Sequence, residues 1–250
     1  MNILEISEAA LMHAMHILQT GGIVAHATET CYGFACDLAN EQAVEKLFAL
    51  KKRPTDQPVS ALFASIENAK RYVEWNEEAE KLAKKYLPGP LTLILPFRSG
   101  ARTIYPIAPS QFAICNSQIR TVGIRISSHP LAQELVSRFG SFMQNSSMDS
   151  TGQAPRASMP APQGKKLFTE MGAGLRPAFP RPFASPLSTT SANLHGQPNS
   201  YSAEEIVKQF EDQKLQPDLI LDSGLLPIIP PSTILDLTRP NVRTVRKGTL

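Results

Sequence analysis

The stretch Leu47-Phe48-Ala49-Leu50-Lys51-Lys52-Arg53-Pro54-Thr55-Asp56-Gln57-Pro58 ends an apolar helical pattern with three cations and a proline. Val44, Leu47 and Phe48 repeat at helical spacing, which predicts a helix that begins at Asn40 and ends before Pro54. Cations in a last helical turn often satisfy free carbonyl groups and the negative end of the helix dipole. The cluster is therefore either a helix cap or an anion site.

Two polar turns favour the anion site. Thr28-Glu29-Thr30 follows the apolar run that begins at Ile23, and Ser188-Thr189-Thr190-Ser191-Ala192-Asn193 follows a short run near Leu187. Proteins of the α/β class place their ligands at the ends of strands. Taken alone, each turn is equally compatible with a strand exit or a capped turn.

Helices and strands alternate along most of the chain, which predicts an α/β fold with a mixed sheet and helices against it. Capping residues and apolar periodicity predict helices from Ser7 to Leu18, from Asn40, over Ile66–Val73, Glu77–Leu87 and Leu131–Phe139, and after Ser202. Apolar and alternating runs predict strands from Ile23, over Pro58–Phe63, Leu91–Phe97 and Val122–Ile126, near Leu187, and over Leu219–Leu221, Thr233–Leu237 and Val242–Val245.

Composition excludes several classes of protein. With 250 residues, of which 42% are hydrophobic and 19% charged, the chain has enough apolar residues for one globular domain. No apolar run approaches the ~20 residues of a membrane span, and Glu5 and Glu8 interrupt any signal-like segment. The cysteines Cys31, Cys36 and Cys115 are odd in number and show no CxxC spacing, which predicts reduced thiols in the cytoplasm. No histidine lies at ligand spacing from another ligand, so we expect no metal held by protein side chains.

The segment from residue 141 to 185 differs from the rest of the chain. It holds five basic and two acidic residues, a difference equal to the whole formal net charge of +3, and six of the prolines. It shows no sustained periodicity, which predicts a long irregular insertion. The insertion is either a solvated loop or an arm that covers a site or contacts a polyanion. We expect it at the rim of the cleft beside Ser191.

Seven short signatures occur in one order along the chain, and this order closely resembles the YrdC-like family of threonylcarbamoyl-AMP synthases. The signatures are Thr28-Glu29-Thr30-Cys31-Tyr32-Gly33, Lys51-Lys52-Arg53-Pro54, Pro88-Gly89-Pro90-Leu91-Thr92-Leu93, Val122-Gly123-Ile124-Arg125, Thr190-Ser191-Ala192-Asn193, Pro231-Ser232-Thr233 and Val245-Arg246-Lys247-Gly248. The resemblance covers everything except the insertion. It implies a single YrdC-like catalytic domain over residues 1–250, with a twisted mixed sheet around a basic cleft and without the added carboxy-terminal domain of longer relatives.

The resemblance also implies a reaction. Members make L-threonylcarbamoyl-adenylate from L-threonine, bicarbonate and ATP, releasing pyrophosphate, for N6-threonylcarbamoyladenosine at position 37 of tRNAs that read ANN codons. Mg²⁺ would arrive on the ATP phosphates. Downstream tRNA threonylcarbamoyl-transfer proteins would be partners, and weak tRNA binding is a further expectation.

Site residues follow from the same resemblance. For catalysis it implies Lys51 and Arg53, which would contact phosphates. For ATP binding it implies Lys51, Arg53, Thr121, Ser191, Asn193 and Arg246. For threonine binding it implies Thr28, Thr30, Tyr32, Arg125, Thr190 and Ser232, with Arg125 on the substrate carboxylate. The choice between Thr28 and Thr30 as the main threonine contact stays open.

Two departures and two alternative functions accompany this interpretation. Ala27 stands where members usually have proline, and Leu62 stands where some relatives have a threonine-binding histidine.

A pI near 8.8 and the basic insertion favour a non-enzymatic RNA-binding or ribosome-maturation factor, although no RNP-type aromatic motif is present. A carbamoyl-transfer module is the other alternative, although its usual companion domains are missing from this sequence.

Overall fold

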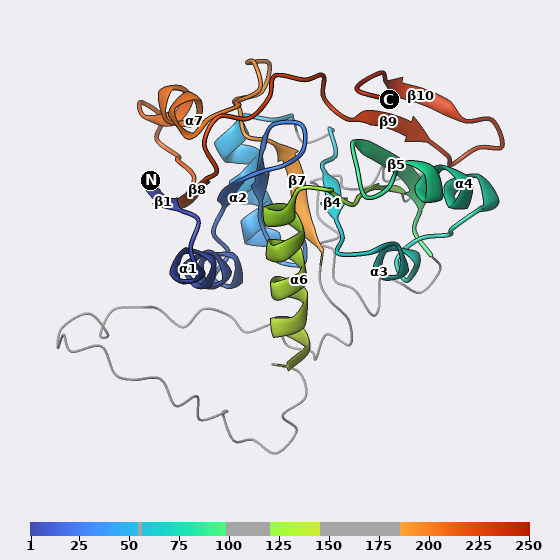
Figure 1. Cartoon of the computed structure of the whole chain (residues 1–250), viewed down its shortest axis with the longest axis horizontal. Helices are drawn as coiled ribbons and strands as arrows, with labels where there is room; N and C mark the ends of the chain where they lie inside the picture. Colours follow the sequence, from blue (N-terminus) through green and yellow to red (C-terminus); the bar gives the residue numbers. More distant parts are fainter. Residues whose placement is uncertain (55–56, 99–120, 146–185) are drawn as a thin grey trace.

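The computed structural model describes residues 1–54, 57–98, 121–145 and 186–250 (Figure 1). Its strands are β1 (Asn2–Glu5), β2 (Val24–Ala27), β3 (Tyr32–Ala35), β4 (Ser60–Leu62), β5 (Leu91–Pro96), β6 (Thr121–Arg125), β7 (Leu187–Ser191), β8 (Leu219–Asp222), β9 (Thr233–Asp236) and β10 (Arg243–Arg246). Its helices are α1 (Glu8–Gln19), α2 (Glu41–Lys51), α3 (Ile66–Lys70), α4 (Glu77–Tyr86), α6 (Pro130–Asn145) and α7 (Ala203–Phe210).

The described strands form one twisted mixed sheet in the order β1-β8-β2-β3-β7-β4-β6-β5-β9-β10, which confirms the predicted fold class. β7 lies in the middle, antiparallel to β3 on one side and to β4 on the other. The N-terminus lies beside β1 and the C-terminus beside β10, near opposite ends of the sheet (Figure 1). Signatures from both halves of the sequence therefore meet at the centre of the sheet.

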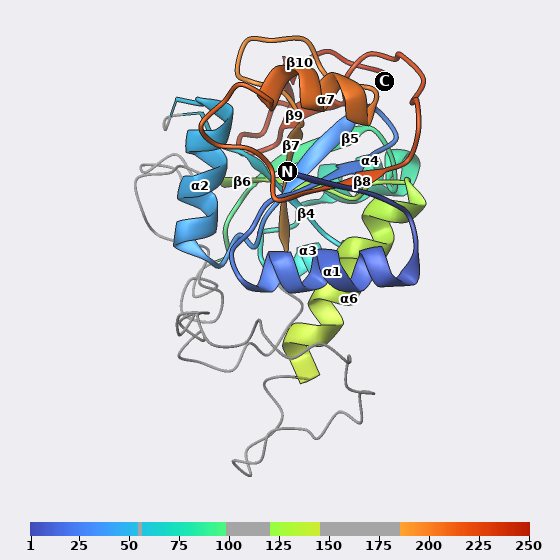
Figure 2. The ribbon, with the colours of Figure 1, turned by 90° about the vertical axis from the view of Figure 1, so that its left-hand side faces the viewer.

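Helices cover both faces of the sheet. α1 and α6 pack against each other and against β2 on one face, and α7 lies on the opposite side (Figure 2). Phe210 of α7 meets Phe34 of β3 edge to face, with ring centroids 5.4 Å apart. Such aromatic pairs stabilise a core by about 0.5 to 1.5 kcal/mol beyond their area burial. The buried apolar residues form one continuous core cluster across these layers.

The predicted helix starts are confirmed by capping bonds. Ser7 accepts a hydrogen bond from the Ala10 amide, and Asn40 accepts one from the Ala43 amide. Ser202 likewise caps α7. These side chains satisfy amide groups that have no partner within the helix, a contribution of about 1 kcal/mol each.

Three sequence predictions need correction. β1 and β3 were not predicted, the first because it is an exposed edge strand and the second because it directly follows a polar turn. β8 lies between β1 and β2, whereas β9 pairs with β5 and β10, so the last three strands of the chain are divided between the two ends of the sheet. α6 continues to Asn145, so residues 141 to 145 are helical and do not belong to an irregular insertion. The remainder of that insertion, and its predicted place beside Ser191, lie outside the described residues.

Within the described ranges, no helix is long and apolar enough to cross a membrane. Cys31 and Cys36 are free thiols buried in the fold, as predicted, and Cys115 lies outside the described residues.

Candidate active site

A cavity over the middle of the sheet brings most of the signatures together. Three arginines line it, namely Arg53 after α2, Arg125 at the end of β6 and Arg246 at the end of β10. Hydroxyl side chains supply much of the remaining wall. Nine of the twelve predicted site residues line this cavity: Arg53, Ser191, Arg246, Thr28, Thr30, Tyr32, Arg125, Thr190 and Ser232.

The other three predicted residues do not line the cavity. Lys51 and Asn193 lie directly behind its wall, joined to Ser191 by hydrogen bonds. Thr121 pairs with Pro96 at the end of β6 away from Arg125. The structure therefore does not bring Thr121 together with the other predicted nucleotide contacts, and its contact with ATP stays a prediction.

Lys51 joins two signatures that are distant in the sequence. Its ammonium donates to the carbonyl oxygens of Ser191 at 2.5 Å and Asn193 at 2.7 Å, and to Oδ1 of Asn193 at 3.2 Å. Ser191 Oγ donates to the same Oδ1 at 2.6 Å. The side chain is only 1% exposed. The helix-cap interpretation is thus wrong for Lys51, because its acceptors belong to the end of β7 and the turn that follows, and not to its own helix.

Burial and the nearby Arg53, in that order, lower the pKa of Lys51 from 10.5 to about 7. In the unfolded chain the pKa returns to 10.5, so between these two values the unfolded state binds more protons than the folded state. The protein is therefore most stable, with respect to this group, above pH 10.5, where Lys51 is neutral in both states. That part of the stability is lost as the pH falls to about 7, because the unfolded state takes up the proton first.

We therefore expect the free energy of unfolding to rise from pH 7 to pH 9, and the rise to be smaller in Lys51→Met. Urea denaturation of both proteins at each pH measures the difference. Equal pH slopes for the two proteins would contradict the low pKa of Lys51.

Arg53 occupies a different environment although it lies only two residues away. Its Nε donates to the Gln57 carbonyl oxygen at 2.8 Å, and its Nη2 donates to the Pro58 carbonyl oxygen at 3.0 Å. These bonds fold the guanidinium back over the loop after α2 and leave it half-buried at the cavity. Lys52 has a left-handed backbone with φ of 51°, which turns the chain so that Lys51 and Arg53 point to different places.

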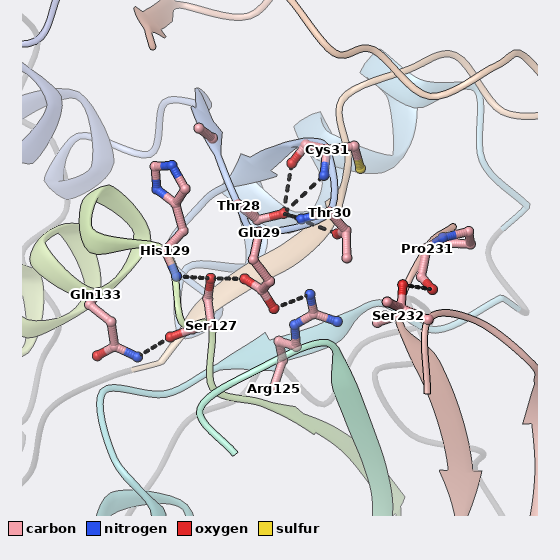
Figure 3. A network of polar contacts seen from close by, with 12 residues as sticks. Thr28, Glu29, Thr30, Cys31, Arg125, Ser127, His129, Gln133, Pro231 and Ser232 are labelled. Carbon is pink, nitrogen blue, oxygen red and sulfur yellow. Dashed lines mark hydrogen bonds and ion pairs between the residues drawn. The ribbon is translucent and has the colours of Figure 1, made fainter. Parts of the chain in front are cut away.

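Arg125 is buried and bonded to a carboxylate that was not predicted as a site residue. Its Nη2 lies 2.6 Å from Oε1 of Glu29, and the hydroxyl of Ser127 donates to the other Glu29 oxygen (Figure 3). Burial lowers the pKa of Arg125, and Glu29 acts in the opposite direction. An arginine stays protonated despite such a shift.

Arg246 is tied to the segment before β9. Its Nε donates to the Ser232 carbonyl oxygen at 2.9 Å and its Nη2 donates to Ser232 Oγ at 2.8 Å. Burial, then Arg125, lowers its pKa, with a smaller effect from Arg53. Arg125 and Arg53 thus repel the Arg246 guanidinium, and an anion bound near it would relieve this repulsion.

The threonine pair at the end of β2 is internally bonded. Thr28 Oγ1 donates to the Cys31 carbonyl oxygen at 2.7 Å and lies 3.1 Å from Oγ1 of Thr30. Tyr32 directs its hydroxyl away from the cavity, since it donates to the Gly224 carbonyl oxygen at 2.9 Å and accepts from the Ser223 amide at 2.8 Å. Tyr32 therefore does not offer its hydroxyl to a ligand in the cavity.

Comparison with known proteins identifies the family. The sequence model of the Sua5/YciO/YrdC family, described as "telomere recombination", matches residues 16–169 and 175–248. The chain belongs to this family.

Named members are similar over much of their length. A threonylcarbamoyl-AMP synthase of Photobacterium profundum is 31% identical over 148 residues, which are 58% of this chain and 75% of that protein. A threonylcarbamoyl-AMP synthase of Pyrococcus abyssi is 29% identical over 246 residues, 98% of this chain but 56% of that protein. The solved structure of P. abyssi Sua5 with L-threonine superposes with a TM-score of 0.70 at 27% identity, covering 100% of this chain and 57% of that one. The chain thus spans little more than half of the Pyrococcus relative.

Other cavity residues of this Sua5/YciO/YrdC member were missed by sequence reasoning. Ser60, Thr92 and Asn199 line the cavity, and each lies outside or at the edge of the polar turns that drew attention. Thr92 stands directly opposite Arg125 in the β5–β6 pair, so the sheet register places it there. Leu62, where some relatives have histidine, is fully buried in the core.

Proposed function

We propose that this chain makes L-threonylcarbamoyl-AMP from L-threonine, bicarbonate and ATP and releases pyrophosphate, in the service of N6-threonylcarbamoyladenosine formation at position 37 of tRNAs that read ANN codons. The observation that carries the proposal is the convergence of three arginines on one hydroxyl-lined cavity. Its relatives bear the name threonylcarbamoyl-AMP synthase, and one related structure holds L-threonine. The chain is then a nucleotidyltransferase.

The reaction suits a cavity of cations and hydroxyls. The amine of threonine combines with bicarbonate to give a carbamate and water. A carbamate oxygen then attacks the α-phosphorus of ATP, and the bond to the leaving pyrophosphate breaks. No covalent enzyme intermediate is required, so positioning and charge neutralisation supply the rate enhancement. Cys31 fits this account, because burial raises the pKa of its thiol and disfavours the nucleophilic thiolate.

Arg125 is the proposed partner of the threonine carboxylate. It lies in the cavity opposite Thr92 and near the Thr28–Thr30 turn. The hydroxyl of Thr28 already donates a hydrogen bond to the Cys31 carbonyl oxygen, so the hydroxyl of Thr30 is freer to form a hydrogen bond with a ligand. We therefore favour Thr30 over Thr28 as the main side-chain contact, with Thr190 and Ser232 also on the cavity wall.

Arg53 and Arg246 are the proposed partners of the ATP phosphates, with Ser191 beside them. Lys51 and Asn193 support this position from behind the wall by holding Ser191. The described residues that line the cavity include no carboxylate. Mg²⁺ would therefore enter on the triphosphate and neutralise part of its charge, with the hydroxyl groups as the available protein oxygens.

Replacement of Arg125 by lysine tests the threonine assignment. We expect Arg125→Lys to raise the KM for L-threonine about 10- to 100-fold while changing the KM for ATP less than about twofold, because an ammonium cannot reproduce a two-pronged bond to a carboxylate. Steady-state kinetics with each substrate varied in turn measure both values. Arg138→Lys is the matched control, since Arg138 pairs with Glu8 and Glu134 on the surface. Equal rises in both KM values would contradict the assignment.

Direct detection of the product tests the function as a whole. Incubation with ¹³C-bicarbonate, L-threonine and ATP should yield a threonylcarbamoyl-adenylate whose mass carries the label. Carbamoyl phosphate should not replace bicarbonate, which separates the synthase from a carbamoyl-transfer module. An adenylate without the label would contradict bicarbonate as the source of the carbamoyl carbon, and the absence of any adenylate would contradict the proposal and favour an RNA-binding role.

The cellular setting follows from this function. We expect the protein to act in the cytoplasm and to pass its labile product to tRNA threonylcarbamoyl-transfer proteins. Weak binding to tRNA and a single catalytic domain over residues 1–250 remain parts of the proposal.

A further inference from the structure

Glu29 holds a position that the proposed reaction leaves unexplained. It lies between Thr28 and Thr30, which both line the cavity, yet Glu29 does not. Its carboxylate is 14% exposed and faces Arg125, whose side chain is 6% exposed. Among the described residues, Glu29 is the one carboxylate bonded to a cavity arginine, because Arg53 bonds to backbone carbonyls and Arg246 to Ser232.

Both oxygens of this carboxylate are fixed. Oε1 accepts from Arg125 Nη2, and Oε2 accepts from the hydroxyl of Ser127. Ser127 Oγ in turn accepts from the His129 amide at 3.1 Å, and Gln133 Nε2 donates to the Ser127 carbonyl oxygen at 2.5 Å. Figure 3 shows this chain of bonds running from the start of α6 to the guanidinium. The carboxylate therefore cannot rotate freely around Arg125.

The bond to Glu29 uses one nitrogen of a guanidinium that has five N–H donors in one plane. The structure gives the Arg125 guanidinium no other hydrogen bond among the described residues. Its remaining donors are thus available on the cavity side, toward Ser232 (Figure 3). A buried ion pair by itself often contributes little to stability, because desolvation offsets the attraction. Orientation of the guanidinium explains the Glu29–Arg125 pair better than a gain in stability does.

We propose that Glu29 is a positioning residue, which holds the Arg125 guanidinium in the plane that receives the carboxylate of an amino-acid substrate. The proposal rests on the proposed function, in which that substrate is L-threonine. Glu29 touches neither the substrate nor the reacting atoms, and acts through Arg125 alone. The effect of Glu29 on threonine binding must therefore vanish in a variant that has no guanidinium at position 125.

A double-mutant cycle tests this dependence. In the wild-type background, Glu29→Gln should raise the KM for L-threonine about tenfold and leave the KM for ATP unchanged, because an amide holds the guanidinium more weakly than a carboxylate does. In the Arg125→Lys background the same change should raise the threonine KM less than about twofold, as residues that act through one another are not additive. A tenfold rise in both backgrounds would overturn the proposal, since it would show an effect independent of Arg125.

Two further variants keep the test decisive. Ser127→Ala frees one Glu29 oxygen and should raise the threonine KM about threefold, again only when Arg125 is present. If Glu29→Gln does not fold, this variant carries the test, and an unchanged threonine KM overturns the proposal. Glu8→Gln is the matched control, because Glu8 pairs with Arg138 on the surface and should leave both KM values unchanged.

The failure of this inference is distinguishable from the failure of the proposed function. A wild-type protein without threonine-dependent pyrophosphate release would refute the function itself, and with it the role of Glu29. A wild-type protein that releases pyrophosphate normally, together with a fully active Glu29→Gln, would refute the positioning role alone.

Discussion

Replacement of Lys51 by methionine is expected to reduce product formation at least about 100-fold and to destabilise the protein, because two signatures lose the group that joins them. The Asn193 carbonyl oxygen would lose its bond to Lys51 in a buried place, whereas the half-buried Ser191 carbonyl oxygen would still accept from the Asn193 amide. Unsatisfied buried acceptors cost about 1 to 3 kcal/mol each, and removal of a buried charge offsets part of this cost, so we expect a net loss of about 2 kcal/mol. Urea denaturation and initial rates measure the two effects.

Lys52→Met is the control for this substitution. Lys52 is the next residue, exposed to solvent and outside the cavity. It should keep its stability within about 0.5 kcal/mol and retain full activity. A Lys51→Met protein with normal activity would show that the bonds between Lys51 and the turn after β7 are not needed for function.

Arg53→Ala is expected to raise the KM for ATP about 100-fold, a loss of about 2.7 kcal/mol of transition-state stabilisation, while leaving stability nearly unchanged. The difference from Lys51 follows from their surroundings. Arg53 is half-buried and bonds to carbonyl oxygens of its own loop, which water can satisfy after the substitution. Its guanidinium is available to the phosphates of a nucleotide in the cavity.

Arg98→Ala is the matched control for Arg53→Ala, because it removes an exposed arginine outside the cavity. Isothermal titration with a non-hydrolysable ATP analogue separates binding from turnover. If Arg53→Ala bound the analogue as tightly as the Arg98→Ala control, Arg53 would only hold the loop after α2 and would not be a phosphate ligand.

Local features of the chain were readable from the sequence. Ser7, Asn40 and Ser202 begin helices because their side chains bond to free amides, and this depends only on neighbouring residues. Long-range pairing was not readable in the same way. β3 and β7 are separated by more than 150 residues, and only their pairing brings Gly33 beside Ser191. The order of the signatures identified the family and nine of the residues that line the cavity, but it did not separate them from Lys51 and Asn193, which do not line it.

The site shows the same division. The three arginines were predicted through the resemblance to the family, and only the cations at the end of α2 indicated an anion site from the residues alone. The place of Lys51 behind the wall was not predicted, since a lysine two residues from Arg53 looks equivalent to it in the sequence. Glu29 was missed because a carboxylate in a polar turn resembles a solvated side chain. Its role depends on the end of β6, which lies 96 residues away in the chain.

Pyrophosphate release by the purified full chain is the most direct test of the central claim that one arginine-lined cavity joins threonine, bicarbonate and ATP. The rate should be high with all three substrates and fall to background when either L-threonine or bicarbonate is omitted. Pyrophosphate release at an equal rate without threonine would contradict the account, because Arg125 and the hydroxyl wall around it would then have no part in the reaction.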